Sequence, residues 1–294
     1  MLPTTFAGPN ALVSLDGNLH KRRKQMLIPP FHGQRMQAYA QLICNATKQV
    51  MTQWKIDEPF HVQRSMQDIS LQVILRAIFG INDKARFQQL RQLLNSLVNL
   101  MSGSLSSSIL FFRTLQQDWG SWSLWGRFVR LRQQIDEIIY TEIKRRRDDP
   151  TLLGEDILSL MMAARNEEDE PMTDVELRDE LMILLVGGHE TTAMSMAWAL
   201  YWVHHLPKVY KKLMVELNTL GDNPASNDIV RLPYLNAICK ETLRIYPTVI
   251  FTSYRIVQKP IEIMGYQFEP GTFLSPCVYL THRRKDSILR AESV

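Results

Sequence analysis

The stretch that decides the fold is TDVELRDELMILLVGGHETTAMSMAWALYWVHH, residues 173–205. One helical face collects the residues that recur at three- and four-residue spacing, which are Leu177, Leu181, Leu184, Gly188, Thr191, Ser195 and Trp198. A helix of this span is about 50 Å long, enough to cross a whole domain. Glu176 follows Thr173 by three residues, and this spacing predicts a capping box at the start of the helix.

The hexapeptide GGHETT, residues 187–192, interrupts this apolar helix. Two adjacent glycines inside a helix cost about 2 kcal/mol relative to alanines, so we expect the helix to be broken or opened here. Missing side chains also leave room for a flat ligand beside the backbone. The carboxylate of Glu190 and the hydroxyl of Thr191 would offer that ligand a path for protons. The alternative for Thr191 is an ordinary buried threonine.

His189 and Glu190 also open the H-E-x-x-H pattern of zinc proteases. Residue 193 is alanine, so the second histidine ligand is missing. The sequence therefore argues against a zinc site, and no metal-ligand set is expected within this chain.

The composition is that of an ordinary globular protein, with 294 residues, 45% hydrophobic, 22% charged and a net charge of +4. No linker-like segment divides the chain, so we expect one domain. The basic runs at residues 21–24 and 144–147 are not interleaved with aromatic residues, which argues against a nucleic-acid partner. The second run is expected to be a solvated helix face.

Cys44, Cys239 and Cys277 form no Cys-x-x-Cys pair, a usage typical of free thiols in a reducing compartment. We therefore expect a cytoplasmic protein. No run of 18 apolar residues and no signal peptide are found, so no membrane anchor is expected in this chain.

Apolar periodicity predicts further helices over residues 16–27, 33–54, 62–79, 84–100, 124–147, 156–164, 207–220 and 233–246. Asp16 is the expected N-cap of the first. Short strands are predicted over residues 251–256, 261–265 and 272–275. Loops are predicted over residues 102–108, before an aromatic stretch at 111–125, and around Asn227. The fold class is thus mostly α, with a small β-sheet near the C-terminus.

Glu241 and Arg244 are three residues apart on the last of these helices. Such pairs are usually solvated and contribute a few tenths of a kcal/mol. The apolar neighbours of this pair favour a partly buried position, where each charge requires a partner.

Residues 241–247, ETLRIYP, resemble the E-x-x-R helix of the cytochrome P-450 family, the haem-thiolate monooxygenases. GGHETT resembles the central-helix motif of that family, [AG]-G-x-[DE]-T-[TS]. Three further segments resemble family elements in the family's order: residues 17–31, residues 254–272 and the -HR-D- element at residues 281–286. Each motif is weak alone, but five in the right order are specific.

The resemblance implies the helical body of the cytochrome P-450 fold and a haem cofactor. It implies that Glu190 and Thr191 manage protons while dioxygen is cleaved. Gly187 and Gly188 would let the helix backbone approach the macrocycle.

The resemblance also places residues around the haem. His20, Lys24 and Arg255 match positions that bind the propionates, with Lys24 standing where the family usually has arginine. Lysine pairs with a carboxylate as a point charge rather than as a fork, so looser binding is expected. Glu241 and Arg244 would be a structural pair.

The activity implied is the insertion of one oxygen atom from dioxygen into an apolar small molecule. The electrons would come from a separate ferredoxin or flavoprotein reductase, because the chain contains no flavin or iron–sulfur motif.

The chain departs from the family in one defining feature. The haem-ligating cysteine lies on a loop F-x-x-G-x-x-x-C-x-G, and the chain has no such loop. Cys44 is expected in a helix, Cys239 in a turn before Glu241 and Cys277 in a strand, all as inert thiols.

The resemblance covers residues 8–286 of a single incomplete domain, 1–294, and residues 287–294 resemble nothing in the family. We therefore expect a fragment, truncated at both ends, that is inactive alone. Two alternatives are a catalytically dead remnant that acts as a ligand-binding or interaction module, and an unrelated helical bundle with chance matches.

Overall fold

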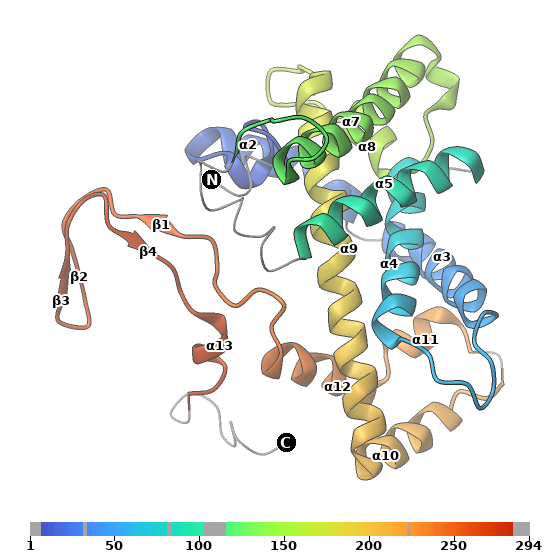
Figure 1. Ribbon diagram of the computed structural model, residues 1–294. Helices are drawn as coiled ribbons and strands as arrows, with labels where there is room; N and C mark the ends of the chain where they lie inside the picture. The colour runs from blue at the N-terminus through green and yellow to red at the C-terminus, as the bar shows by residue number, and fades with distance from the viewer. Residues whose placement is uncertain (1–6, 32–33, 81–83, 103–115, 223, 285–294) are drawn as a thin grey trace. The chain divides into compact units, whose positions relative to one another are not determined.

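The computed structural model describes residues 7–31, 34–80, 84–102, 116–222 and 224–284 (Figure 1). The chain forms two compact units, Met1–Glu190 and Thr191–Val294, and each is described by itself. The predicted fold class is confirmed, because helices dominate and the strands are few and short. The expectation of one domain stays a prediction, as do those for the tail at 287–294, which lies outside the described residues.

Unit 1 is helical. Its elements are α2 (Gly17–Leu27), α3 (Gln34–Met51), α4 (Val62–Phe79), α5 (Lys84–Ser102), α7 (Leu124–Asp148), α8 (Ile157–Ala163) and the first half of α9 (Asp174–His205), with short 3-10 turns at Leu12–Ser14, Pro29–Phe31 and Pro150–Leu152. Most bounds agree with the periodicity to within three residues. Asp16 is the N-cap of α2, but its side chain makes no capping hydrogen bond. The loop predicted at 102–108, and most of the aromatic stretch after it, lie outside the described residues.

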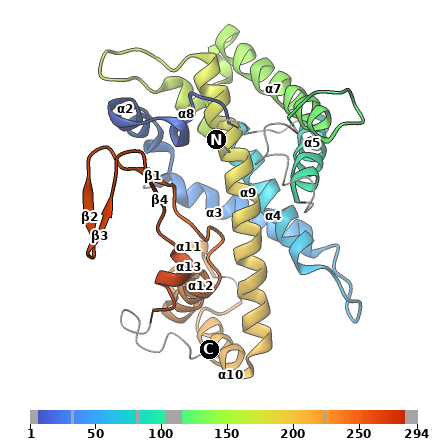
Figure 2. The ribbon, with the colours of Figure 1, turned by 60° about the vertical axis from the view of Figure 1, so that its left-hand side comes forward.

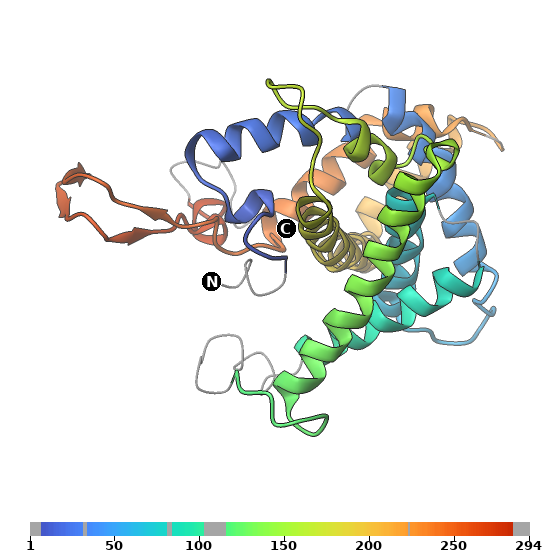
Figure 3. The same cartoon turned by 90° about the horizontal axis from the view of Figure 1, so that it is seen from above.

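The apolar faces of these helices meet in one core. Its fully buried side chains repeat at three- and four-residue spacing, as the periodicity requires, and include Leu71, Leu75 and Ile78 of α4, Leu90, Leu94 and Leu97 of α5, Ile135, Ile139 and Ile143 of α7, and Leu177 and Leu181 of α9. Figure 3 looks nearly along the axis of α9, coloured yellow.

The helix α9 is continuous through GGHETT, so the predicted break is wrong (Figures 1 and 2). Glycine keeps both backbone hydrogen-bonding groups, so it lowers helix propensity without removing a bond. The expected cap is confirmed: the Thr173 hydroxyl accepts from the backbone N–H of Glu176, and the Glu176 carboxylate accepts from that of Thr173.

Unit 2 contains the second half of α9 and a series of short elements. They are α10 (Pro207–Asn218), α11 (Ser226–Val230), α12 (Pro233–Ile245), β1 (Arg255–Ile256), β2 (Ile261–Ile263), β3 (Tyr266–Phe268), β4 (Phe273–Leu274) and α13 (Val278–Thr281). The strands β1 and β4 pair antiparallel, with Arg255 opposite Leu274, and β2 and β3 pair with Ile261 opposite Phe268.

Several local predictions in unit 2 are wrong. The strand expected at 261–265 turns at Met264 and Gly265, both at positive φ, because a two-residue hairpin turn requires that geometry. The strand expected at 251–256 is short, and Phe251 only bridges to Cys277. Cys277 caps α13 instead of lying in a strand, and Cys239 lies inside α12. The loop expected around Asn227 contains α11.

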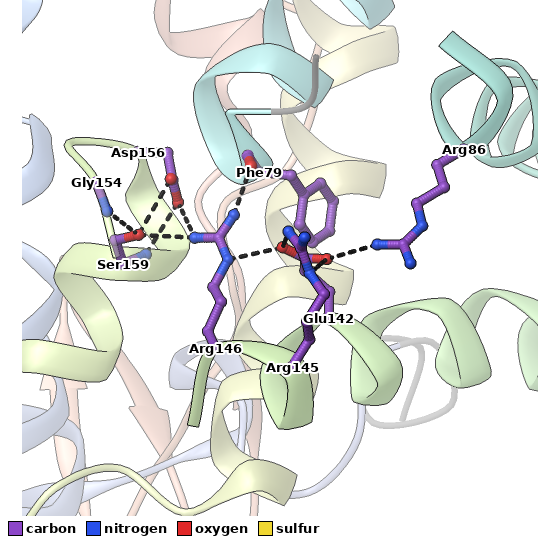
Figure 4. Close-up of polar contacts among 8 residues, drawn as sticks. All are labelled: Phe79, Arg86, Glu142, Arg145, Arg146, Gly154, Asp156 and Ser159. Carbon is purple, nitrogen blue, oxygen red and sulfur yellow. Dashed lines mark hydrogen bonds and ion pairs between the residues drawn. The ribbon is translucent and has the colours of Figure 1, made fainter. Parts of the chain in front are cut away.

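The basic run at 144–147 is not simply a solvated face, because Arg146 is only 3% exposed. Its guanidinium donates to Glu142 Oε1 at 2.7 Å, Asp156 Oδ1 at 2.6 Å and Ser159 Oγ at 2.7 Å (Figure 4). It also donates to the backbone oxygen of Phe79 at 2.5 Å. These bonds fasten α7 to α8 and to the end of α4, and they satisfy a charge that would otherwise be costly to bury.

A second buried charge cluster fastens the N-terminal segment to α9. Arg178 donates to the Ala7 carbonyl at 2.7 Å. Asp179 accepts from the backbone N–H of Asn10 at 3.0 Å. Glu180 accepts from that of Leu12 at 2.7 Å. The three consecutive charges of α9 therefore hold residues 7–12 through their backbone.

Burial raises the pKa of Glu180 to about 7, although the hydrogen bond from Leu12 and the charge of Arg23 act in the opposite direction. Between pH 4.5 and 7 the folded chain therefore binds a proton that the unfolded chain releases. The contribution of this group to stability is complete below pH 4.5 and is lost as pH rises through 7.

We predict that Glu180→Gln removes this pH dependence. Glutamine keeps an acceptor for the Leu12 N–H but does not titrate. The free energy of unfolding of the variant, relative to the wild type, should rise by up to about 3 kcal/mol between pH 4.5 and 8. Urea unfolding across this range measures it, with the exposed Glu167→Gln as control. The prediction is contradicted if the difference in free energy of unfolding between Glu180→Gln and the wild type is the same at every pH.

Candidate functional site

The candidate site lies on α9, where residues 187–191 present different sides of the helix. Each residue is rotated by about 100° from the last, so His189 points one way, Gly188 and Glu190 flank it, and Gly187 lies opposite. The burial agrees, because His189 is 1% exposed and Gly187 is exposed. Gly187 precedes Glu190 by three residues and Thr191 by four, so these three residues share a face.

The two glycines have different surroundings. A Cβ on Gly187 would meet no atom within 4 Å among the described residues, whereas a Cβ on Gly188 would lie 3.0 Å from Ile74 Cδ1. Ser70 also donates its hydroxyl to the His189 carbonyl at 3.0 Å. Gly188 is thus explained by the close packing of α4, and Gly187 leaves an open stretch of backbone that suits the approach of a flat ligand.

Glu190 is held by a side chain that the sequence analysis missed. The amide nitrogen of Gln67 on α4 donates to Glu190 Oε1 at 2.9 Å and to Oε2 at 3.2 Å. The Glu190 side chain remains 27% exposed, so it is oriented without being sealed from its surroundings. No local pattern could have identified Gln67, which is 123 residues away in the chain.

His189 is an unusual neighbour for this carboxylate. Neither ring nitrogen has a hydrogen-bond partner among the described residues, although Nε2 lies 3.4 Å from Glu190 Oε1. Burial lowers the pKa of His189, and the charges of Glu190 and Asp68 oppose that effect. The imidazole is therefore neutral near pH 7.

The residues expected to bind haem propionates lie in both units. His20 is half-buried and Lys24 is exposed on α2, one turn apart on the same face of the helix. Arg255, in β1 of unit 2, is exposed, and its Nη1 lies 3.4 Å from the Ser253 carbonyl. Their joint role stays a prediction.

Glu241 and Arg244 form the expected pair. The guanidinium donates from Nε and Nη2 to the two carboxylate oxygens at 2.7 and 2.6 Å. These hydrogen bonds lower the pKa of Glu241 and raise that of Arg244. Arg244 also donates to the His282 carbonyl at 2.7 Å, so the pair ties α12 to the residue that follows α13.

Aromatic stacking fastens α12 to the second half of α9. Tyr246 lies on Trp198 with ring centroids 4.1 Å apart and planes within 9°. Trp198 belongs to the helical face predicted from the sequence, and this contact gives that face its partner in unit 2.

The described residues fit part of a haem site. The open backbone at Gly187, next to an oriented carboxylate and a hydroxyl on the same face, suits the side of a macrocycle where protons are handled. The thiolate side is not matched, because Cys44, Cys239 and Cys277 lie in α3, in α12 and at the N-cap of α13. No described helix is both long and apolar enough to cross a lipid bilayer.

The family model described as cytochrome P450 matches residues 4–290. The chain therefore belongs to the cytochrome P450 family. It is 33% identical over 276 residues to putative cytochrome P450 135B1 of Mycobacterium tuberculosis, covering 94% of this chain and 56% of that protein. It is also 33% identical over 274 residues to putative cytochrome P450 137 of the same species, covering 90% and 54%. The chain thus spans little more than half the length of these curated relatives.

Solved structures show the same fold. Retinoic acid bound cyanobacterial CYP120A1 superposes with a TM-score of 0.83 at 21% identity, covering 99% of this chain and 64% of the other. The haem domain of cytochrome P450DA superposes with a TM-score of 0.79 at 19% identity, with the same coverage.

We predict opposite effects for alanine at the two glycines. Gly187→Ala should raise the free energy of unfolding by about 1 kcal/mol, because alanine favours the helix and its methyl group meets no atom. Gly188→Ala gains the same propensity but must displace Ile74, so it should stabilise less or destabilise.

Urea unfolding measures the free energy of unfolding of the single variants and of the double variant Gly188→Ala with Ile74→Val. Valine lacks the Cδ1 atom that the new methyl group would clash with. The double variant should therefore have a higher free energy of unfolding than the added effects of the two single changes predict. Equal effects at both glycines would show that the contact with Ile74 does not matter.

For the ion pair of Glu241 and Arg244 we predict that Arg244→Met lowers the free energy of unfolding more than Glu241→Gln does. The arginine makes three charged hydrogen bonds, so its loss should cost about 2–3 kcal/mol. Glu241 is 42% exposed, so water replaces its bonds and the cost should be about 1 kcal/mol. Thermal unfolding compares both with the exposed Lys240→Met, and equal losses for the pair would contradict the assigned link to His282.

Proposed function

We propose that the intact protein is a haem-thiolate monooxygenase that inserts one oxygen atom from dioxygen into an apolar organic substrate. The chain of 294 residues supplies the helices and the proton-handling side. One observation carries this proposal beyond family membership: the open backbone at Gly187 shares a face of α9 with Glu190 and Thr191, and Glu190 is held in place by Gln67.

Haem, when bound, supplies the iron at which dioxygen is activated. The residues of the chain bind, orient and move protons around it. Gly187 lets a flat ligand approach the backbone. Glu190 takes up and releases a proton at its carboxylate, and the Thr191 hydroxyl can pass that proton along the same helical face. Gln67 fixes the direction of the carboxylate, so the side chain is already oriented for proton transfer.

The remaining roles are supported by the family motifs. His20, Lys24 and Arg255 would pair with the propionates, and Glu241 and Arg244 would be a structural pair. His20 is half-buried and Lys24 is exposed on α2, so both side chains can meet a carboxylate from outside the helix. Gly188 is assigned to the packing of α4 rather than to the cofactor.

The apolar class of substrate has support from one structural neighbour, a cyanobacterial protein solved with retinoic acid bound. A separate ferredoxin or flavoprotein reductase would supply electrons. None of the three cysteines forms a disulfide, in keeping with our proposal of a cytoplasmic site of action.

The absence of the cysteine loop from this sequence gives a direct prediction. When the 294-residue chain is mixed with haemin, reduced and exposed to carbon monoxide, it should not show the red-shifted Soret band of thiolate ligation, because no cysteine lies in the family loop. It should also form no hydroxylated product. A variant with all three cysteines changed to serine is the control and should give the same spectrum. A red-shifted band from the unchanged chain would overturn this part of the proposal.

A second arm tests the activity. The chain is joined to the C-terminal part of a family member that carries the cysteine loop, and product formed per electron consumed is measured. Glu190→Gln and Thr191→Ala should each lower that ratio by tenfold or more, with Glu167→Gln unchanged. A thiolate-ligated protein whose product ratio is unaffected by both changes would show that this pair does not handle protons.

A further inference from the structure

His189 is a buried polar side chain that the proposed mechanism does not yet use. It stands between Gly188 and Glu190 on α9, and its backbone carbonyl accepts from the Ser70 hydroxyl of α4 at 3.0 Å. It is 1% exposed, and both of its ring nitrogens are without a hydrogen bond among the described residues. Buried polar groups in native proteins nearly always have partners, so a side chain in this state needs an explanation.

A carboxylate oxygen of Glu190 accounts for one of the two ring nitrogens. His189 Nε2 lies 3.4 Å from Glu190 Oε1, the oxygen that also accepts from Gln67 at 2.9 Å. A rotation of the ring that directs Nε2–H at Oε1 and shortens the contact by about 0.3 Å would form a hydrogen bond. The neutral ring carries one N–H, and a tautomer with that hydrogen on Nε2 donates it to the carboxylate.

Two charged groups act on the imidazole, one from α9 and one from α4. Glu190 belongs to α9 itself, Asp68 to α4 and Arg91 to α5, and Arg91 forms an ion pair with Asp68. Both carboxylates favour the charged form of His189, and burial disfavours it. Asp68 thus acts on the ring through its charge, whereas Glu190 also lies in contact with it.

We propose that His189 is a positioning residue for Glu190: its Nε2–H and the Gln67 amide hold the carboxylate from two helices. The inference rests on the proposed role of Glu190 in handling protons. The held carboxylate keeps its second oxygen, Oε2, directed by Gln67 alone, so a proton can be exchanged there without releasing the contact at Oε1.

The test uses the full 294-residue chain without haem, labelled with nitrogen-15 at histidine. The signals of His189 are assigned by their loss in His189→Gln. In the wild type we expect a neutral ring with hydrogen on Nε2 at pH 7 and a titration midpoint below that of an exposed histidine. Glu190→Gln and Asp68→Asn, both of which keep the shape of the side chain, should each move the midpoint to still lower pH, because each removes a charge that favours the imidazolium.

Glu167→Gln makes the same chemical change at an exposed carboxylate of unit 1 and should leave the His189 signals unchanged. Hydrogen on Nδ1, or a midpoint unaffected by both Glu190→Gln and Asp68→Asn, would overturn the inference. If one of these variants fails to fold, the other decides. A structural role alone would not tie the tautomer to Glu190. The NMR measurement needs no haem. The role of His189 can therefore be refuted while the proposed monooxygenase function stands, and the proposed function can be refuted while the role of His189 stands.

Discussion

The contact of α4 with α9 is the interaction on which the candidate site depends. Ile74 lies over Gly188, Ser70 bonds the carbonyl of His189, and Gln67 reaches the carboxylate of Glu190. These three residues of α4 are spaced by three and four, so one face of one helix sets the rotation of the other. Once that rotation is fixed, Gly187 must lie on the far side of α9. The open backbone there is therefore a consequence of packing elsewhere.

Buried charges give this arrangement its register. Apolar faces alone pack in several nearly equivalent ways, whereas Arg146 and Arg178 each find their acceptors in one alignment only. Arg146 fixes α7 against α8 and α4, and Arg178 with its two neighbours fixes residues 7–12 on α9. Removing one partner from such a group leaves an uncompensated charge, which costs more than the pair contributes. The alignment of α7 with α8 and α4, and that of residues 7–12 with α9, thereby depends on buried charges.

The sequence predicted helices well because each helix contains its own signal. Periodicity located α4 and the start of α7, and the capping box of Thr173 located the start of α9. Prediction from the sequence failed where the deciding contact comes from a distant part of the chain. Arg146 looks like a solvated residue in a basic run, and its burial depends on acceptors from two other elements. Gln67 has no local signature at all, and the ends of the short strands depend on which residues adopt positive φ.

The nature of the group that holds Glu190 bears on how it can act. A cation at the place of Gln67 would favour the ionised carboxylate and oppose its protonation. An amide orients the carboxylate with two hydrogen bonds and adds no net charge, so it favours the ionised form less strongly than a cation would. A neutral imidazole that donates to Oε1 likewise adds no net charge. Two neutral donors from different helices thus fix the direction of an acid and oppose its protonation less than a cation would, and this combination suits a proton-handling carboxylate.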